Sequence, residues 1–277
     1  MKLLRIQKGD QSLPCILDKD ENIRILENID DLSSSNINST YFNEISKIDI
    51  STLKIAPSNS KILPCIKNTS KVVCIGLNYS DHCKETGMDI PKEPLVFSKA
   101  VSSIIGPNDD VYLPPNSKKS DWEVELGIII QKKAKNINLD EVNDYIAGYT
   151  IVNDISERYF QLELGGQFIK GKSYDTFCPV GPYLVTQDEI NDLDNLTMSL
   201  KVNDQIMQNG NTKNMIFKPE YIVYYLSKFM TLMPGDIIPT GTPPGVGMGQ
   251  KPPVFLKKGD VMELEIENLG KQKQKVF

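Results

Sequence analysis

Short apolar segments, closely interrupted by glycine and proline, are the feature that most restricts the fold of this chain. Its 277 residues include 18 glycines and 17 prolines, and few long helical patterns. Four apolar segments are typical of β-strands, and the last of them alternates as an exposed edge strand does: residues 72–76, 122–130, 147–152 and 261–266. Residues 221–233 are the best helix candidate, closed by a Pro-Gly pair. We therefore expect an α+β fold dominated by β-structure, and not a doubly wound sheet.

The first seventy residues differ in texture from the rest. Residues 3–6 and 15–17 predict two short strands joined by a turn at Gly9-Asp10, and a polar stretch follows at 33–40. Closely spaced strands begin at residue 71. Since the length permits two domains, we expect a small β-rich N-terminal domain at 1–70 and a larger domain at 71–277.

Composition and charge exclude several classes of protein. The formal net charge is -5 and no basic stripe is visible, so a nucleic-acid partner is not expected. No apolar run approaches the roughly 18 residues that span a bilayer, and charged residues interrupt the N-terminus before a secretory signal could form. Five cysteines, an odd number with no CxxC pair, favour a reducing compartment. We therefore expect a cytoplasmic protein.

The only histidine of the chain, His82, lies three residues before Glu85. On a helical turn the two side chains would share a face. The carboxylate would then hold one ring nitrogen and leave the other to accept a proton from water. A solvated histidine in a surface turn ended by Gly87 explains the spacing as well, so both interpretations stay open.

Two glutamates, Glu123 and Glu125, point to one face of an apolar strand because side chains alternate along a strand. Buried like charges are costly unless a positive group lies between them, and an arginine, a lysine or a metal ion could supply it. Asp154, at the end of the next apolar strand, offers a third carboxylate. Three oxygen ligands without a nearby His or Cys suit Mg²⁺ or Mn²⁺ better than zinc. A salt-bridged edge strand is the alternative.

Two glycine-rich segments suggest anion binding. Gly166 to Ser173 matches the P-loop pattern GxxxxGK[ST], but no plain buried strand precedes it and prolines leave no room for a helix after it. ATP or GTP binding is therefore not expected. Residues 241–247 predict a rigid loop whose backbone N–H groups could cradle a carboxylate.

Residues 72–267 together resemble the fumarylacetoacetate hydrolase family. The motifs that carry the resemblance are Gly76-Leu77-Asn78-Tyr79 with His82 and Glu85, Trp122 to Gly127, Val152-Asn153-Asp154, Gly171 to Thr176, and Thr240 to Gly247. Residues 1–5 and 157–182 are most similar to the bacterial branch labelled ureidoglycolate lyase or 2,4-diketo-3-deoxy-L-fuconate hydrolase. The resemblance implies a mixed β-roll or β-sandwich catalytic domain at 71–277, and a homodimer.

The resemblance also implies roles for individual residues. It implies a metal ion, Mg²⁺ or Mn²⁺, held by Glu123, Glu125 and Asp154. The implied catalytic residues are the water-activating pair His82–Glu85, on a segment that can order as a lid, and Lys172. The implied substrate-binding residues are Arg158, Gln161, Thr242 and Lys99. A further metal-ligating aspartate found before the histidine in some members is missing from residues 74–78, so we expect three carboxylate ligands.

The resulting hypothesis is a metal-dependent hydrolase that cleaves a carbon–carbon bond in a small β-diketo acid, such as an acylpyruvate or a diketo-deoxy sugar acid. His82 would remove a proton from the attacking water, and the metal and Lys172 would stabilise the negative charge that develops. Alternatives at the same site are ureidoglycolate cleavage, oxo-acid decarboxylation and tautomerisation. A non-catalytic binder of small acids is a third kind of function.

Overall fold

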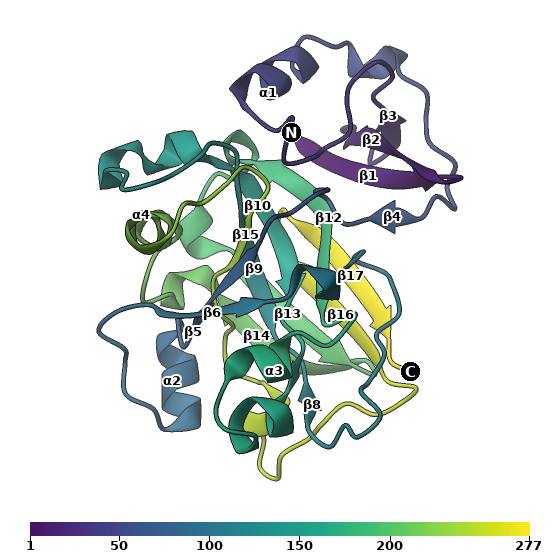
Figure 1. Ribbon diagram of the computed structural model, residues 1–277. Helices are drawn as coiled ribbons and strands as arrows, with labels where there is room; N and C mark the ends of the chain where they lie inside the picture. The colour runs from purple at the N-terminus through teal and green to yellow at the C-terminus, as the bar shows by residue number, and fades with distance from the viewer.

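The computed structural model describes residues 1–277 and joins most of its strands in one eleven-stranded sheet (Figure 1). From edge to edge the main path runs through β3 (Ile23–Ile25), β2 (Gln11–Leu17), β1 (Lys2–Lys8), β12 (Cys178–Thr186), β10 (Ile146–Asn153), β9 (Val124–Ile130), β15 (Ile237–Pro239), β5 (Val72–Gly76) and β6 (Leu95–Lys99). Off this path, β4 (Ile62–Leu63) pairs with β1, and β7 (Ile104–Ile105) pairs with β12. The β-dominated α+β fold expected from the sequence is confirmed.

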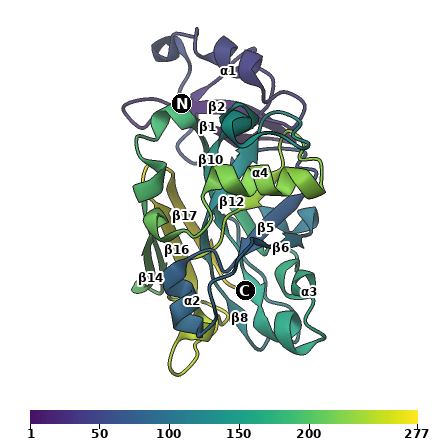
Figure 2. The ribbon, with the colours of Figure 1, turned by 90° about the vertical axis from the view of Figure 1, so that its left-hand side faces the viewer.

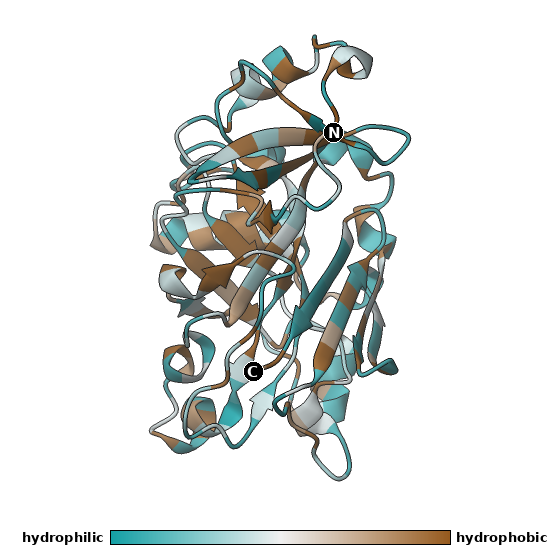
Figure 3. Ribbon diagram, turned by 90° about the vertical axis from the view of Figure 1, so that its right-hand side faces the viewer, coloured by the Kyte–Doolittle hydropathy of each residue, from teal (hydrophilic) through white to brown (hydrophobic).

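A second sheet has four strands in the order β14 (Gln205–Asn211), β13 (Thr197–Val202), β16 (Val261–Ile266) and β17 (Gly270–Lys275). The larger core contains residues of both sheets, among them Leu126 and Ile128 of β9 with Leu200 of β13 and Leu264 of β16. Figure 3 shows apolar residues concentrated in the inner strands and polar residues along the outer loops. The prediction of an exposed edge strand at 261–266 is wrong, because β16 pairs with strands on both sides and β17 forms that edge.

The N-terminal strands extend the large sheet. β1 pairs with β12 through Lys2↔Val185 and Leu3↔Leu184, so the sheet runs without a break across residue 70. A second core likewise combines N-terminal and later residues, including Leu3 with Ile129. Helix α1 (Ser39–Ile45) begins inside the polar stretch, where the Asn38 side chain accepts a hydrogen bond from Tyr41 N at 3.0 Å and caps the helix.

Three further helices lie outside the sheets: α2 (Ser80–Thr86), α3 (Phe168–Lys172) and α4 (Pro219–Phe229). Figures 1 and 2 show α2 and α3 at the end of the molecule away from the N-terminal strands. Helix α4 begins with a proline, which fits the first helical turn. It ends four residues earlier than expected, because Met230 is extended at φ −144° and ψ 156°. None of the helices has the length and apolarity needed to span a bilayer.

The remaining regular structure is short. β8 (Ser120–Asp121) pairs with β11 (Ser156–Glu157) in a separate two-stranded sheet. A π-helical turn covers Tyr159–Glu163, and 3₁₀ turns cover Ile50–Thr52, Val101–Ser103, Leu139–Tyr145, Gln187–Glu189, Leu193–Asn195, Thr212–Asn214 and Gly247–Gly249. β8 lies directly before β9 in the chain and β11 directly after β10, so this small sheet continues the central strands toward the candidate site.

Candidate active site

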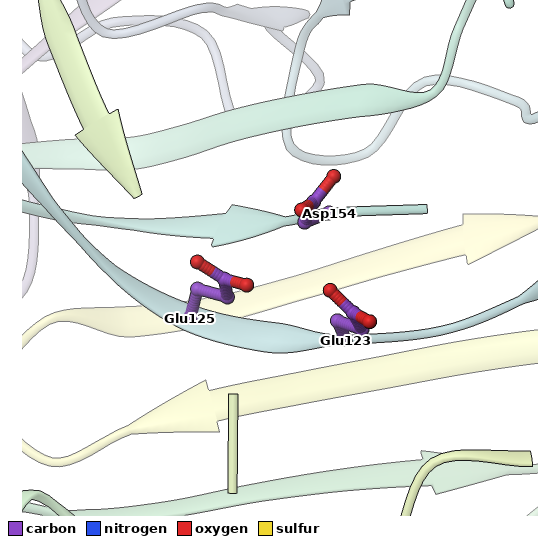
Figure 4. A group of neighbouring side chains, drawn as sticks. All are labelled: Glu123, Glu125 and Asp154. Atoms are coloured by element: carbon purple, nitrogen blue, oxygen red, sulfur yellow. The ribbon is translucent and has the colours of Figure 1, made fainter. Parts of the chain in front are cut away.

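The three carboxylates expected from the sequence come together where β9 begins and β10 ends. Val152 pairs with Glu125, and Asp154 N donates to Glu123 O at 2.9 Å, so Asp154 lies opposite Glu123. One oxygen of each carboxylate lies within 4.8 Å of the others, and all three residues are buried. Figure 4 shows the three side chains directed into the same space from two neighbouring segments.

Alternation along β9 explains why charged and apolar residues share one strand. Even-numbered side chains such as Val124, Leu126 and Ile128 enter the larger core. Odd-numbered side chains face the other side, where Ile129 belongs to the second core. Glu125 lies on this second face as well, nearer the start of the strand. The carboxylates therefore lie at the end of a buried face, as the spacing predicted.

Three buried cations surround the carboxylates. Lys172 Nζ donates to Glu123 Oε2 and to Asp154 Oδ2, each at 2.7 Å. Lys99 Nζ donates to Asp154 Oδ1 at 2.6 Å, and Arg158 Nη2 donates to Glu123 Oε1 at 2.6 Å. Both oxygens of Glu123 and both oxygens of Asp154 are thus hydrogen-bonded to cations.

Glu125 is the exception in this group, because no ion pair reaches it. Its one hydrogen bond comes from Gly241 N to Oε2, at 2.7 Å. Burial, with the nearby Asp154 and Glu123 carboxylates, raises the pKa of Glu125 well above its usual value. Burial also opposes the ionisation of Glu123, but Lys172 and Arg158 hold the pKa of that carboxyl well below its usual value. The pKa values of Glu123 and Glu125 thus shift in opposite directions, because only Glu123 is hydrogen-bonded to cations.

The residues present fit a divalent metal ion. The donors are carboxylate oxygens alone, which hard cations such as Mg²⁺ and Mn²⁺ prefer. Four buried carboxylates, the three above and Asp121, face three buried cations, so one negative charge has no partner. The carboxyl without a cation beside it is Glu125, one of whose oxygens lies within 4.8 Å of an oxygen of each of the other two carboxylates.

His82 and Glu85 lie on α2 and contact each other as the i, i+3 spacing predicted. His82 Nδ1 lies 2.9 Å from Glu85 Oε2, and both side chains are largely shielded from solvent. An ionised carboxylate can only accept a hydrogen bond, so Nδ1 is the protonated nitrogen of the neutral ring. Nε2, which makes no hydrogen bond to the protein, is then free to accept a proton. The solvated surface histidine considered above is excluded.

The glycine-rich loop at 241–249 holds carboxylates of the protein itself with its backbone N–H groups. Gly241 N donates to Glu125 Oε2 at 2.7 Å, and Gly245 N donates to Glu85 Oε1 at 2.8 Å. Gly245 has φ +106°, and a Cβ there would lie 2.0 Å from Met207 O, so only glycine fits. Four residues span at most about 14 Å. One short loop therefore brings the histidine–glutamate pair and the metal-type carboxylates into a single site.

The four residues implied as substrate contacts are also buried here, and each is hydrogen-bonded to the protein. Arg158 Nη1 donates to Gln161 Oε1 at 3.1 Å. The Thr242 hydroxyl donates to Val124 O at 2.9 Å and accepts from Gln208 Nε2 at 2.8 Å, which attaches the loop to β9. Lys99 donates to Asp154 and to Ile155 O. In this arrangement Thr242 and Lys99 support the carboxylates and the loop.

Asp121 is a member of the site that the sequence analysis did not single out. It is fully buried and accepts hydrogen bonds from Arg158 Nε at 2.8 Å and from Gly247 N at 2.6 Å. One signal was present in the sequence, since Asp121, Glu123 and Glu125 alternate in one register. The segment that matches the P-loop pattern does not fold as a P-loop, because α3 begins inside it and a π-helical turn precedes it where a P-loop requires a strand.

Three comparisons connect this site to known proteins. A family model described as fumarylacetoacetate (FAA) hydrolase, C-terminal, matches residues 71–277. The chain is 49% identical over 276 residues to a Burkholderia lata protein whose assignment as a hydrolase is provisional, and the match covers 99% of this chain and 98% of that protein.

Solved structures of two enzymes share the fold over their whole length. The 2-hydroxyhepta-2,4-diene-1,7-dioate isomerase of Mycobacterium marinum is 32% identical with a TM-score of 0.79, covering 100% of this chain and 98% of that chain. The maleylpyruvate hydrolase of Sphingobium sp. SYK-6, solved with manganese(II) and pyruvate, is 28% identical with a TM-score of 0.82 and the same coverage. The chain belongs to the fumarylacetoacetate hydrolase family.

Proposed function

We propose that this protein is a divalent-metal-dependent hydrolase that cleaves a carbon–carbon bond in small β-diketo acids of the acylpyruvate type, diketo-deoxy sugar acids included. The observation that carries the proposal is the buried group of Glu123, Glu125 and Asp154, in which Glu125 has no cation partner. The histidine–glutamate pair held by the same loop supplies the base that a hydrolase needs. The related maleylpyruvate hydrolase, solved with manganese(II) and pyruvate, supports the choice of metal and substrate class.

In the proposed reaction His82 is the general base. Its Nε2 takes a proton from water, the water oxygen bonds to the carbonyl carbon remote from the substrate carboxylate, and the adjacent carbon–carbon bond breaks. The products are a carboxylic acid and pyruvate or a substituted pyruvate, whose carbon at the broken bond takes up a proton. Glu85 accepts from Nδ1–H throughout, so it orients the ring and stabilises its charged form.

Lys172 is placed to meet the negative charge that develops on the departing product. Its ammonium has three N–H donors, and two are used by Glu123 and Asp154. The third can donate to a substrate oxygen. A divalent ion held by Glu123, Glu125 and Asp154 would supply Lewis acidity to a bound oxo-acid. Arg158 and Gln161 are the proposed substrate contacts, since Arg158 contacts Glu123 and Gln161 accepts a hydrogen bond from Arg158.

A panel assay tests the reaction class. Protein treated with EDTA and reloaded with Mg²⁺ or Mn²⁺ would be given an acylpyruvate, oxaloacetate or ureidoglycolate. Release of pyruvate with a carboxylic acid from the acylpyruvate is the expected result. Pyruvate from oxaloacetate alone would indicate a decarboxylase, and glyoxylate from ureidoglycolate would indicate the lyase. No turnover of any of them would support a non-catalytic binder.

His82→Ala tests the role of the base with a control on the same helix. The variant should bind Mn²⁺ as the wild type does, because His82 contacts none of the three carboxylates, but it should lose turnover at least a hundredfold. Lys84→Ala, an exposed position of α2, is the matched control and should keep full activity. Unchanged kcat in His82→Ala would remove the histidine from the mechanism.

Isomerisation is the second candidate, favoured by the related isomerase of Mycobacterium marinum. It would use the same base to move a proton from the enol oxygen to a carbon atom without breaking the carbon chain. The absorbance of an unsaturated 2-hydroxy-dioate would then change without release of pyruvate. The homodimer implied by the family is part of the proposal as well, and light scattering that gives the mass of a single 31.1 kDa chain would contradict it.

A further inference from the structure

Asp121 is a fully buried carboxylate fixed by four N–H donors from three parts of the chain. Oδ1 accepts from Trp122 N at 2.8 Å and from Gly247 N at 2.6 Å. Oδ2 accepts from Met248 N at 3.0 Å and from Arg158 Nε at 2.8 Å. With both oxygens engaged, the carboxylate has one orientation.

Arg158 receives its own orientation from this carboxylate. The guanidinium is planar, so a contact at Nε fixes the directions of Nη1 and Nη2. Nη2 then reaches Glu123 Oε1 at 2.6 Å, and Nη1 reaches Gln161 Oε1 at 3.1 Å. The pairing of β8 with β11, Ser156↔Asp121, places the two side chains on adjacent backbones.

The contact between Asp121 and Arg158 determines whether the arginine binds one or both carboxylate oxygens of Glu123. Arg158 occupies Oε1 only, while Oε2 accepts from Lys172 Nζ, which also donates to Asp154 Oδ2. Without Asp121, a buried arginine would have Glu123 as its sole anion and would be drawn onto both oxygens. It would then compete with a metal ion for this ligand.

We infer that Asp121 is a positioning residue, which holds Arg158 against one oxygen of Glu123 and so keeps the guanidinium off the other oxygen, which accepts from Lys172 alone and stays accessible to a divalent cation. This inference rests on the proposed metal site. It assigns the Gly247–Met248 amides a role too, because they keep the Asp121 carboxylate turned toward Arg158.

Mn²⁺ binding by the metal-free protein, followed by calorimetry, tests the inference without using activity. In Asp121→Asn the amide Oδ1 can keep the Gly247 contact, but an NH₂ group replaces the acceptor for Arg158 Nε. We expect the Kd for Mn²⁺ to rise about tenfold, since a metal ligand contested by a freed cation costs about 1.4 kcal/mol or more of binding.

Glu157→Gln is the matched control. Glu157 is equally buried on the partner strand β11, but its carboxylate accepts from Ser117 Oγ and Ser120 Oγ and does not touch Arg158. Its Kd should stay within twofold of the wild type. A similar rise in both variants would mean that general loosening of the small sheet weakens the site, and would overturn the inference.

A double-mutant cycle isolates the route through the arginine. In an Arg158→Met background no guanidinium remains to be positioned, so adding Asp121→Asn should change the Kd less than twofold. An equal effect in both backgrounds would overturn the inference. If Asp121→Asn does not fold, Arg158→Lys provides the second test, because a lysine keeps the charge but cannot contact Asp121 and Glu123 as a fork. Its Kd should rise several-fold, and an unchanged value would overturn the inference.

Failure of the inference and failure of the proposed function give different results. Wild-type protein that binds no Mn²⁺ would contradict the proposed function and everything that rests on it. Tight binding by the wild type together with equally tight binding by Asp121→Asn would contradict the role of Asp121 alone.

Discussion

Replacement of Glu125 by glutamine should stabilise the metal-free protein, and the effect should grow with pH. Burial and two neighbouring carboxylates raise the pKa of Glu125 well above its usual value. A carboxyl whose pKa is higher in the folded than in the unfolded protein takes up a proton on folding. The free energy of unfolding therefore falls as pH rises from the pKa of this carboxyl in the unfolded protein, about 4.3, toward its pKa in the folded protein. Glutamine resembles the protonated form at every pH.

The size of the effect follows from the linkage relation. Within that window each pH unit costs the wild type about 1.4 kcal/mol that the variant does not lose. For a chain of this length 1 kcal/mol corresponds to about 2 °C in Tm, so one pH unit above pH 5 should widen the difference in Tm by about 3 °C.

Calorimetric scans in EDTA at about pH 5 and pH 6 measure this difference. The window lies above the range in which ordinary carboxyls titrate. Glu44→Gln, an exposed position of α1, controls for the change of acid to amide. Added Mn²⁺ should reverse the order, because it binds the wild type and not Glu125→Gln. Parallel pH dependence of the wild type and Glu125→Gln without metal would refute the view that Glu125 is the one member of the three-carboxylate group without a cation partner.

Three other perturbations have expected outcomes. Gly245→Ala places a Cβ against Met207 O at positive φ and should release Glu85 from the loop, so kcat should fall at least tenfold while Mn²⁺ binding is kept. Lys172→Met removes the cation shared by two buried carboxylates; urea unfolding should show a loss of about 3 kcal/mol in EDTA, partly restored by Mn²⁺. All five cysteines are buried and free, and burial raises the pKa of Cys65 to about 11, so a thiol reagent should react rapidly only after unfolding.

The parts of the site that could be predicted from the sequence are those that lie within one element. Alternation along a strand placed Glu123 and Glu125 on one face, and helical spacing joined His82 to Glu85. Both predictions are confirmed because 2.0 and 3.6 residue periods are properties of the backbone. The position of Asp154 near the two glutamates could also be predicted, because Asp154 follows the end of the next apolar strand. The roles given to these residues stay predictions.

Contacts between distant segments could not be predicted in this way. Asp121 and Gly247 are 126 residues apart, and Lys99 and Asp154 are 55 apart, so no local period links them. The glycine-rich loop was expected to cradle a carboxylate, but the sequence does not say that its amides bind the protein's own acids. The mistaken edge strand at 261–266 has a similar cause, since alternation reports which face is buried and not how many neighbours a strand has.

The glycine-rich loop has a consequence for how this protein tolerates mutation. The loop binds the carboxylates of Glu85, Glu125 and Asp121 through main-chain N–H groups, which every amino acid except proline carries. Met248→Ala would therefore leave the hydrogen bond to Asp121 in place, whereas Met248→Pro would remove it. The Met248 side chain can therefore change over evolutionary time without loosening the acid that its main-chain N–H group holds.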